Sequence, residues 1–337
     1  DYGEGIYYVN SSGAKITSDW RFTTPYEDED ADEEWYYFKS TGKRAENTKV
    51  VYKGNTYYFD GEGKMLTGWV TYENASGSEQ SVDEANGFID GSTYYCDETG
   101  ARVTSDWVKT VAPEDIDNND ADEEWYYFKS TGKAATGRQN NVKGQTYFFS
   151  EEGKMLSGFV GKLASESDAV YIELDDDYAI SNDMFEEVYY CGGSSDGHMK
   201  KNKWILEYAP LEEDEEEENK NYYWIKKTGV VFTATASASN AFNEAITYSF
   251  EEGYLRRDDD ADQPGVVEKL NVNSKYYYFN EEGEMLSGFV RLDGNMYYFG
   301  EDNDGAMKTG AQSIKDDTDE TYQFYFDTKT ATKGQGI

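Results

Sequence analysis

The chain has 337 residues and a formal net charge of −37, and 37% of its residues are hydrophobic. Because nucleic-acid backbones are bound by Lys and Arg, this charge argues against a nucleic-acid partner, and it also disfavours anionic membrane surfaces. The sequence has no apolar run of about 18 residues that could span a membrane, so we expect no membrane insertion. The apolar side chains available for a core are mainly aromatic, with 31 Tyr, 17 Phe and 7 Trp.

The residue types argue against catalysis within this chain. His198 is the single histidine, which excludes a Ser-His-Asp triad, a Cys-His pair and a multi-His metal site. No pair of carboxylates stands out as the pair that glycoside hydrolysis needs. We therefore predict a protein that is not an enzyme, with His198 as an exposed turn residue. The chain has no signal peptide, and we expect it to be a mature or excised piece of a longer protein.

One unit recurs along the chain: an aromatic stretch x-Tyr-Tyr-Phe, then about four residues to a Gly, then six or seven to another aromatic. Clear copies lie at 6–20, 35–43, 56–69, 93–107, 146–159, 276–289 and 296–310, and weaker copies lie at 188–204, 222–229, 247–253 and 323–330. Each unit predicts a β-hairpin whose turn often contains Gly, as in KGN at 53–55. An isolated hairpin is marginal in water, so the hairpins are expected to stack. The prediction is an all-β, elongated β-solenoid of about 11–12 hairpins over 1–337.

The aromatic stretch has a regular alternation of faces, because strand side chains point to opposite sides in turn. The fourth position is always apolar and predicts the buried face; it holds Val9, Phe38, Phe59, Cys96, Phe128, Phe149, Cys191, Ile225, Phe250, Phe279, Phe299 and Phe326. The second position shares that face. The first position lies on the other face and varies, as binding positions on a regular scaffold do. The two Cys are expected to be small buried hydrophobes, the alternative being a disulfide or a reactive thiol.

A longer period of about three hairpins overlies this repeat. Paired aromatics recur once per cycle: Trp20 with Trp35, Trp107 with Trp125, and Trp204 with Tyr222. An acidic tip separates each pair, at 27–34, 115–124 and 211–219, and the stretch DADEEWYYFKSTGK occurs twice, at 30–43 and 120–133. The pattern predicts about three hairpins per superhelical turn in one array over 1–337, with cycles at approximately 5–70, 71–160, 161–255 and 256–337. Longer insertions lie at 71–92 and 160–187, and Phe289 and Met296 hold the paired places in the fourth cycle.

These motifs resemble those of a known family. The stretches KGNTYYFDGEGKMLTGWV at 53–70 and TYYCDETGARVTSDW at 93–107 are similar to the repeats of choline-binding and glucan-binding cell-wall proteins of Gram-positive bacteria, which are related to clostridial toxin repeats. The resemblance covers essentially the whole chain. It implies a β-solenoid of hairpins with about threefold superhelical symmetry, a secreted or bacterial cell-surface location, and ligand sites between consecutive hairpins.

The resemblance also implies which residues bind ligand. The family's sites are aromatic boxes made from the Gly-Trp aromatic, the first aromatic of Trp-Tyr-Tyr and a Tyr of the next hairpin. The candidate ligand-binding residues are Trp20, Trp35, Tyr37, Trp69, Trp107, Trp125, Tyr127, Trp204 and Tyr222. Trp69 ranks last, because its hairpin offers Thr93 in place of a second aromatic. The chain departs from the family where Asp19, Asp106 and Lys203 replace the Gly before Trp. The alternative is that these Trp residues only pack hairpin on hairpin.

The leading hypothesis is a non-catalytic, multivalent binding module that recognises cell-wall or glucan-type carbohydrate, or a choline-substituted polymer, through aromatic sites between hairpins. One alternative is a bacterial adhesin that binds a basic host protein through its acidic tips and insertions. Another is a structural stalk for a missing catalytic domain. No cofactor is expected; Ca²⁺ at the acidic tips is an alternative to simple solvated loops, although no tip has EF-hand spacing.

Overall fold

The computed structural model describes residues 5–28, 30–73, 80–164, 169–174, 177–211, 220–258 and 263–336. The fold is all-β, and the one helix in these ranges is the 3-10 turn Pro113–Asp115. No helix in the described ranges is long and apolar enough to cross a bilayer. The chain forms two compact units, Asp1–Val142 with Phe148–Met155 and Lys143–Tyr147 with Leu156–Ile337. The predicted single array over 1–337 therefore stays a prediction.

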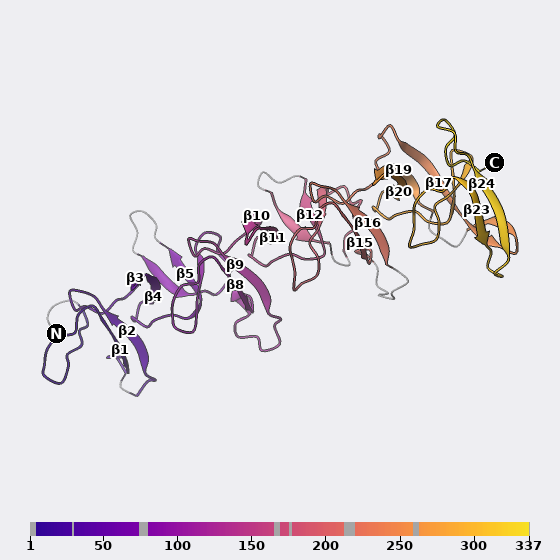
Figure 1. Ribbon diagram of the computed structural model, residues 1–337. Helices are drawn as coiled ribbons and strands as arrows, with labels where there is room; N and C mark the ends of the chain where they lie inside the picture. The colour runs from indigo at the N-terminus through magenta and orange to yellow at the C-terminus, as the bar shows by residue number, and fades with distance from the viewer. Residues whose placement is uncertain are drawn as a thin grey trace. The chain divides into compact units, whose positions relative to one another are not determined.

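The first unit is a succession of antiparallel hairpins in chain order (Figure 1). Its strands are β1 (Asp19–Thr23), β2 (Glu34–Phe38), β3 (Thr48–Tyr52), β4 (Asn55–Phe59), β5 (Gly68–Glu73), β6 (Ser81–Glu84), β7 (Thr93–Cys96), β8 (Asp106–Thr110), β9 (Glu124–Phe128), β10 (Gly137–Val142) and the end of β11 (Gln145–Phe149). Strand β1 pairs with β2, β3 with β4, β5 with β7, and β8 with β9. The insertion at 71–92 adds β6 to the free side of β5, which the sequence did not predict.

The second unit begins with the same architecture. Its strands after β11 are β12 (Phe159–Leu163), β13 (Tyr171–Glu173), β14 (Phe185–Tyr190), β15 (Lys203–Glu207), β16 (Asn221–Ile225), β17 (Ala241–Glu251), β18 (Tyr254–Arg257), β19 (Gly265–Val272), β20 (Lys275–Asn280), β21 (Phe289–Leu292), β22 (Asn295–Tyr298), β23 (Gly310–Lys315) and β24 (Thr321–Phe326). Strand β12 pairs with β14, β15 with β16, and β23 with β24. The insertion at 160–187 adds β13 to β12, as β6 was added to β5.

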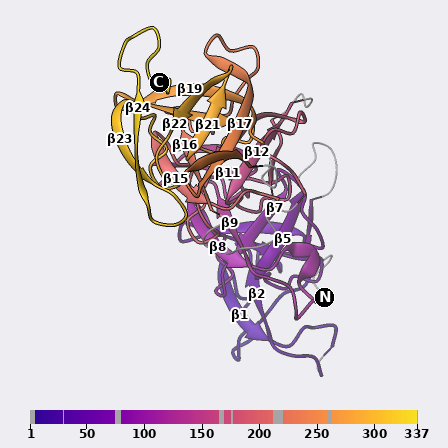
Figure 2. The ribbon, with the colours of Figure 1, turned by 90° about the vertical axis from the view of Figure 1, so that its right-hand side faces the viewer.

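A six-stranded sheet interrupts the hairpin series in the second unit. Its order is β20-β19-β17-β21-β22, with β18 also paired to β17. Figure 2 shows β17 beside β19 and β21. The segment 247–253 lies at the end of the long strand β17, which pairs with three other strands. The weak repeat predicted there is therefore a sheet strand that joins two hairpins edge to edge.

The hairpin turns have the backbone conformation that the Gly pairs predicted. Lys53 and Gly54 have φ values of 48° and 90°, and Asp293 and Gly294 have 44° and 81°. Two consecutive positive φ values define a type I′ turn, whose twist matches that of the flanking strands. Gly at the second place takes this conformation without steric cost. The turns therefore fix the register of the aromatic strands that follow them.

Consecutive hairpins are joined by a recurring backbone hydrogen bond. The N–H of Met65 donates to the carbonyl of Trp35 at 2.9 Å, and that of Met155 donates to Trp125 at 2.8 Å. The same link joins Arg44 to Ile6, Arg102 to Thr56, Ala134 to Thr93, Met199 to Thr146, Val231 to Val188, Met285 to Tyr222 and Met307 to Tyr276. The acceptor is always the first position of an aromatic stretch. Each hairpin thus docks on its predecessor, which confirms the predicted stacking within each unit.

The predicted core position is confirmed in most repeats. Buried fourth-position residues are Phe38, Phe59, Cys96, Phe128, Phe149, Cys191, Ile225, Phe279, Phe299 and Phe326. Both cysteines are free thiols, as their place in the core predicted. Val9 is 55% exposed, so its predicted burial is wrong. In place of a paired hairpin, its repeat forms isolated bridges, from Val9 to Lys15 and from Tyr7 to Lys43. Phe250 of the six-stranded sheet is half-buried.

The third position of the aromatic stretch is also buried in several repeats, which the alternation argument did not predict. Tyr58 and Phe148 have no exposed surface, and Tyr278 is 2% exposed. An alternating pattern assumes that one face of a strand meets solvent. Here a strand has a neighbouring hairpin on each side, so both of its faces lie against aromatic rings. The apolar content of this chain is consequently concentrated in aromatic contacts between hairpins.

Candidate aromatic ligand sites

The structure brings together the first predicted pair, Trp20 of β1 and Trp35 of β2. In the hairpin register Trp20 lies opposite Tyr37, and Phe22 lies opposite Trp35. The two indoles are therefore diagonal neighbours on one face, with ring centroids 6.4 Å apart and planes at 81°. The ring of Phe22 is 5.3 Å from that of Trp35. Phe22 is 51% exposed and Trp35 is 45% exposed, so two rings of this group are open to solvent.

A Tyr of the next hairpin completes the first group, as the resemblance implied. Tyr57 of β4 lies 4.9 Å from Trp20 at an interplanar angle of 71°. Trp20, Trp35 and Tyr57 form the first aromatic site, with Trp20 half-buried between the other two. Edge-to-face packing of this kind is favourable and leaves ring faces available at the rim. Tyr57 carried a sequence signal, because it is the second position of the following repeat.

Tyr37 was also a candidate ligand residue, and the structure places it deeper. It is 7% exposed and contacts Trp20 at 5.1 Å and Phe59 at 6.3 Å. These contacts pack the buried Tyr37 against the Trp20 ring. We assign Tyr37 the role of positioning the Trp20 ring within the stack.

The second pair, Trp107 of β8 and Trp125 of β9, repeats the geometry of the first. The indole centroids are 6.3 Å apart with planes at 87°. Tyr127 lies 5.2 Å from Trp107 and is half-buried, and Phe149 stacks on Trp107 at 5.7 Å. The residue opposite Trp125 is Lys109, whose ammonium lies 3.8 Å from the carboxylate of Glu123. A charged side chain thus stands where the first site has an aromatic ring.

The third site is centred on Trp204 of β15. Its ring contacts Trp224 of β16 at 5.2 Å and Tyr277 of the next hairpin at 4.8 Å, and it stacks on Phe279 at 5.8 Å. Tyr222, the predicted partner, lies two residue pairs further along the hairpin, opposite Leu206. This is the place that Trp35 has in the first site. Trp224 was missed, although it occupies the same third position as Tyr37 and Tyr127.

Trp69 has no open face. It is 3% exposed, its indole N–H donates to the carbonyl of Val111 at 2.9 Å, and its ring contacts Tyr126 at 4.8 Å. Thr93, at the place of a second aromatic, is buried as well, and its hydroxyl accepts a hydrogen bond from the N–H of Ile89. The environment of Trp69 is that of a core residue. Phe289, which holds the place of Trp20, Trp107 and Trp204 in the fourth cycle, is equally buried.

Charged groups stand beside the first two sites in matching positions. The carboxylate of Glu34 is 2.9 Å from the ammonium of Lys64, and that of Glu124 is 2.6 Å from Lys154. Each pair joins a hairpin to the next one beside the exposed Trp. Such half-exposed pairs are worth up to about 1 kcal/mol, so their main effect is to fix the geometry of the rim.

Asp19 replaces the family's Gly before Trp20. Its carboxylate accepts hydrogen bonds from the backbone N–H of Trp20 at 2.9 Å and from Arg21 at 2.8 Å. These two hydrogen bonds lower the pKa of Asp19 and favour its ionised form. Asp19 is therefore ionised and ion-paired with Arg21, directly before Trp20 in the strand.

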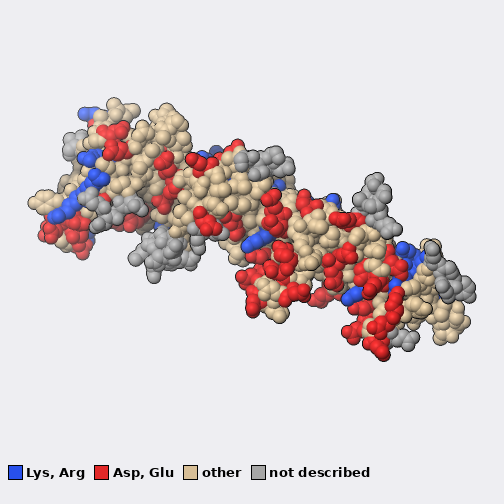
Figure 3. All heavy atoms as spheres, turned by 180° about the vertical axis from the view of Figure 1, so that it is seen from behind, with Lys and Arg blue, Asp and Glu red and all other residues tan. Residues whose placement is uncertain are grey.

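The acidic tips are partly engaged in the fold. Arg44 is buried, and its guanidinium donates two hydrogen bonds to Glu27, at 2.8 and 3.1 Å, while also lying over the ring of Tyr36. On the face drawn in Figure 3, acidic side chains far outnumber basic ones. In the described part of the chain no group of three or more Asp, Glu, His or Cys is placed to hold a metal ion. Most of the third predicted tip, 212–219, lies outside the described residues.

Comparison with known proteins identifies the repeats. A family model described as "Putative cell wall binding repeat" matches 30–43, 52–65, 119–134, 270–285 and 287–307. Glucosyltransferase-S of Streptococcus mutans is 23% identical over 291 residues, which cover 83% of this chain but 16% of that enzyme. The matched segments are therefore similar to cell-wall-binding repeats, as the motifs predicted.

Two solved structures from Streptococcus pneumoniae are similar. One is the choline-binding domain of CbpL, with 15% identity, a TM-score of 0.41, and coverage of 85% of this chain and 95% of that one. The other is the modular autolysin LytC in complex with a synthetic peptidoglycan ligand, with 19% identity, a TM-score of 0.40, and coverage of 93% and 54%.

Proposed function

We propose that this chain is a non-catalytic binding module of a secreted or cell-surface protein. It holds a cell-wall or glucan-type carbohydrate, or a choline-substituted polymer, at aromatic sites between hairpins. The observation that carries the proposal is the recurring group of an exposed or half-exposed Trp pair with a ring of the next hairpin. Trp20, Trp35 and Tyr57 are its clearest example.

The chemistry of the first site suits two kinds of ligand group. A quaternary ammonium over an aromatic face gains about 0.5–2 kcal/mol, and rings at steep angles to one another can surround it. The net charge of −37 adds a favourable potential for a cation. A sugar can instead stack its apolar face on the exposed Trp35 and hydrogen-bond to polar groups at the rim.

A single site of this kind is weak, and repetition supplies the affinity for a polymer. Sites on one scaffold convert the second binding event into an intramolecular one, which raises avidity without any new contact. The first and second sites lie within one unit and have closely matched ring geometry. A polymeric ligand is therefore expected to bind much more tightly than its monomer.

The test is a titration of the intact chain with choline and with a panel of α-glucan oligosaccharides, followed by Trp fluorescence. A saturable change with at least one ligand is expected. Trp35→Ala should weaken binding at the first site, because it removes a Trp ring that is open to solvent. Tyr254→Ala is the matched control, since Tyr254 is 68% exposed and lies outside the three sites.

Two results would reject the proposed function. One is the absence of any saturable change with choline and with every glucan tested. The other is binding that is unaffected by Trp35→Ala and weakens steeply with added salt. That pattern would point to the acidic tips and to a basic partner.

A further inference from the structure

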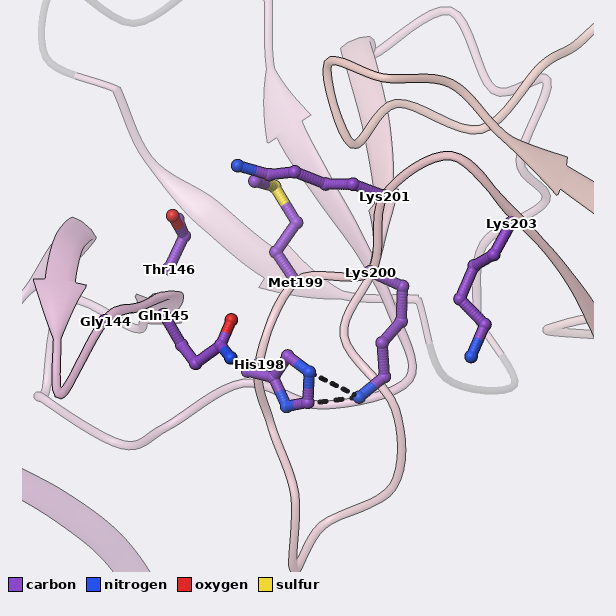
Figure 4. A pocket seen from close by; sticks show the side chains of 8 residues that line it. All are labelled: Gly144, Gln145, Thr146, His198, Met199, Lys200, Lys201 and Lys203. Carbon is purple, nitrogen blue, oxygen red and sulfur yellow. Dashed lines mark hydrogen bonds between the residues drawn. The ribbon is translucent and has the colours of Figure 1, made fainter.

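A basic pocket lies in the second unit, apart from the ring contacts of the aromatic sites (Figure 4). It is lined by Gly144, Gln145, Thr146, His198, Met199, Lys200, Lys201 and Lys203. The segment that follows β14 docks here on the start of β11. The N–H of Met199 donates to the carbonyl of Thr146 at 2.8 Å, and the N–H of Lys200 donates to Tyr190 at 2.8 Å. The pocket walls are therefore held by the same backbone link that joins the other hairpins.

The charge of this pocket is opposite to that of the chain. Three lysines and the single histidine line it, although the whole chain has 31 Lys and Arg against 68 Asp and Glu. One carboxylate, Asp196, bonds to both Lys200 and Nδ1 of His198. Partial burial opposes its ionisation, but the hydrogen bonds from Lys200 and His198 prevail and lower the pKa of Asp196. Among described carboxylates, none forms an ion pair with Lys201 or Lys203. Positive charge is thus left in excess.

Two of the basic groups, Lys200 and His198, are held in place before any ligand arrives. The side chain of Lys200 is 12% exposed, and its ammonium lies 3.1 Å from Nε2 of His198. The His198 ring also contacts Tyr147 at 6.4 Å. In Figure 4 the side chains of Lys200 and Lys203 extend to the side of the His198 ring, and the Gln145 amide points toward that ring. Such fixed donors lose little freedom when a ligand binds.

We propose that this pocket binds a phosphate-type oxyanion. Lys203 and Lys200 supply charge and N–H donors, and the Gln145 amide adds a neutral donor. Charge-assisted hydrogen bonds of this kind are about twice as strong as neutral ones. Two of them at a half-open site give an expected dissociation constant on the order of 1–10 mM for a small oxyanion. The anion is either a free phosphate or a phosphodiester of a polymer.

The position of Lys203 distinguishes this cycle from the other two. Lys203 directly precedes Trp204, whereas Asp19 precedes Trp20 and Asp106 precedes Trp107. The third cycle therefore has a basic residue directly before its Trp, where the other two cycles have an acidic one. A solubilising role alone does not account for this change, because the chain is already strongly charged with the opposite sign.

His198 provides a direct readout, because its imidazole gives the only histidine signals of the chain. The imidazole resonances are followed by NMR while inorganic phosphate, and separately dimethyl phosphate, is added at constant ionic strength and pH. A saturable shift is expected with inorganic phosphate. A comparable shift with dimethyl phosphate would assign the site to phosphodiesters, and its absence would assign the site to phosphate with free oxygens.

Lys203→Gln should weaken binding about tenfold, because it removes one charge-assisted donor. Lys203 is exposed, so this variant keeps the fold, and the unchanged His198 spectrum without ligand verifies that. Lys227→Gln, an exposed lysine of the same unit outside the pocket, is the matched control and should bind as the parent does. The proposal is overturned if chloride at equal ionic strength gives the same shift, if the shift does not saturate, or if Lys203→Gln binds normally. Because the readout is His198 and the probe is phosphate, the result does not depend on whether the aromatic sites bind a ligand.

Discussion

The two copies of DADEEWYYFKSTGK form the same local structure in different surroundings. In both, the aromatic strand pairs with the preceding strand in one register, so that Trp20 lies opposite Tyr37 and Trp107 lies opposite Tyr127. The Trp–Trp distances agree, at 6.4 and 6.3 Å. Fourteen identical residues therefore determine the hairpin and the placement of its rings.

What differs lies outside the duplicated residues. The side chain opposite the second Trp is Phe22 in the first copy and Lys109 in the second. The residue after the copy is Arg44, buried and bonded to the acidic tip, in one case and Ala134 in the other. The second tip instead begins at the end of the 3-10 turn Pro113–Asp115. The comparison teaches that the repeat sets the scaffold, while its neighbours set the chemistry of the ligand site.

The largest expected effect is a loss of unfolding free energy on truncation of a core Phe in each copy. Comparing the two losses tests whether the two copies are equally well packed. Phe128→Ala should cost about 3–5 kcal/mol of unfolding free energy, because Phe128 is fully buried. Phe38→Ala should cost less, since Phe38 contacts Tyr8 of a repeat whose Val9 is exposed. Urea unfolding followed by Trp fluorescence measures both. Equal losses would show that the first copy is packed as firmly as the second.

The next prediction concerns the tip of the first copy. Arg44→Ala should cost about 2–3 kcal/mol, because it removes a buried guanidinium that satisfies Glu27 and covers Tyr36. Amide exchange should rise at the tip 27–34 and stay unchanged at 115–124. Lys109→Ala, which breaks an exposed pair in the second copy, is the control and should change stability by less than about 0.5 kcal/mol. Unchanged exchange at 27–34 would contradict the role given to Arg44.

Exchanging residue types at positions 22 and 109 tests whether these side chains contribute to ligand affinity. This prediction rests on the proposed function. Lys109→Phe should raise the affinity of the second site for choline about threefold to tenfold, because a ring replaces a like charge. Phe22→Lys should lower the affinity of the first site by a similar factor. Trp fluorescence titrations of both variants, with Tyr254→Ala as control, measure the change. Affinities that do not move in opposite directions would mean that Phe22 and Lys109 lie outside the binding surface.

The smallest expected effect concerns the hairpin that supports the second copy. Cys96 is 1% exposed, and burial raises the pKa of its thiol to about 12. A raised pKa keeps the reactive thiolate fraction at pH 8 on the order of one in ten thousand. A thiol reagent at pH 8 should therefore react with the native protein hardly at all, and with two thiols after denaturation. Rapid labelling of the native protein would show that this hairpin opens.

The repeat could be predicted from the sequence because its signals are local. The Gly turns and the apolar fourth position each depend on a few neighbouring residues, and the structure confirms them at positions such as Lys53, Gly54 and Phe59. Stacking followed from the marginal stability of a lone hairpin. The Trp20–Trp35 and Trp107–Trp125 groups followed from the spacing of the repeat.

The rest depends on contacts that a repeat pattern does not encode. Burial of Tyr58 arises from the hairpins on both sides of its strand, and the closed environment of Trp69 depends on Val111, 42 residues away. The strands β6 and β13 come from insertions without the repeat motif. Lys109 could have been placed opposite Trp125 from the hairpin register, but only once the length of the tip between them was known.

The backbone link between hairpins has a consequence for how such a protein can change over generations. Its acceptor is the carbonyl of the first position, so the bond is indifferent to the side chain there, which is Trp35, Thr56, Val188 or Tyr222 in different repeats. Substitution at this position can therefore create or erase an aromatic site while the stacking bond is kept. Ligand preference can thus change one hairpin at a time, because the hydrogen bond that joins the hairpins is made by main-chain atoms.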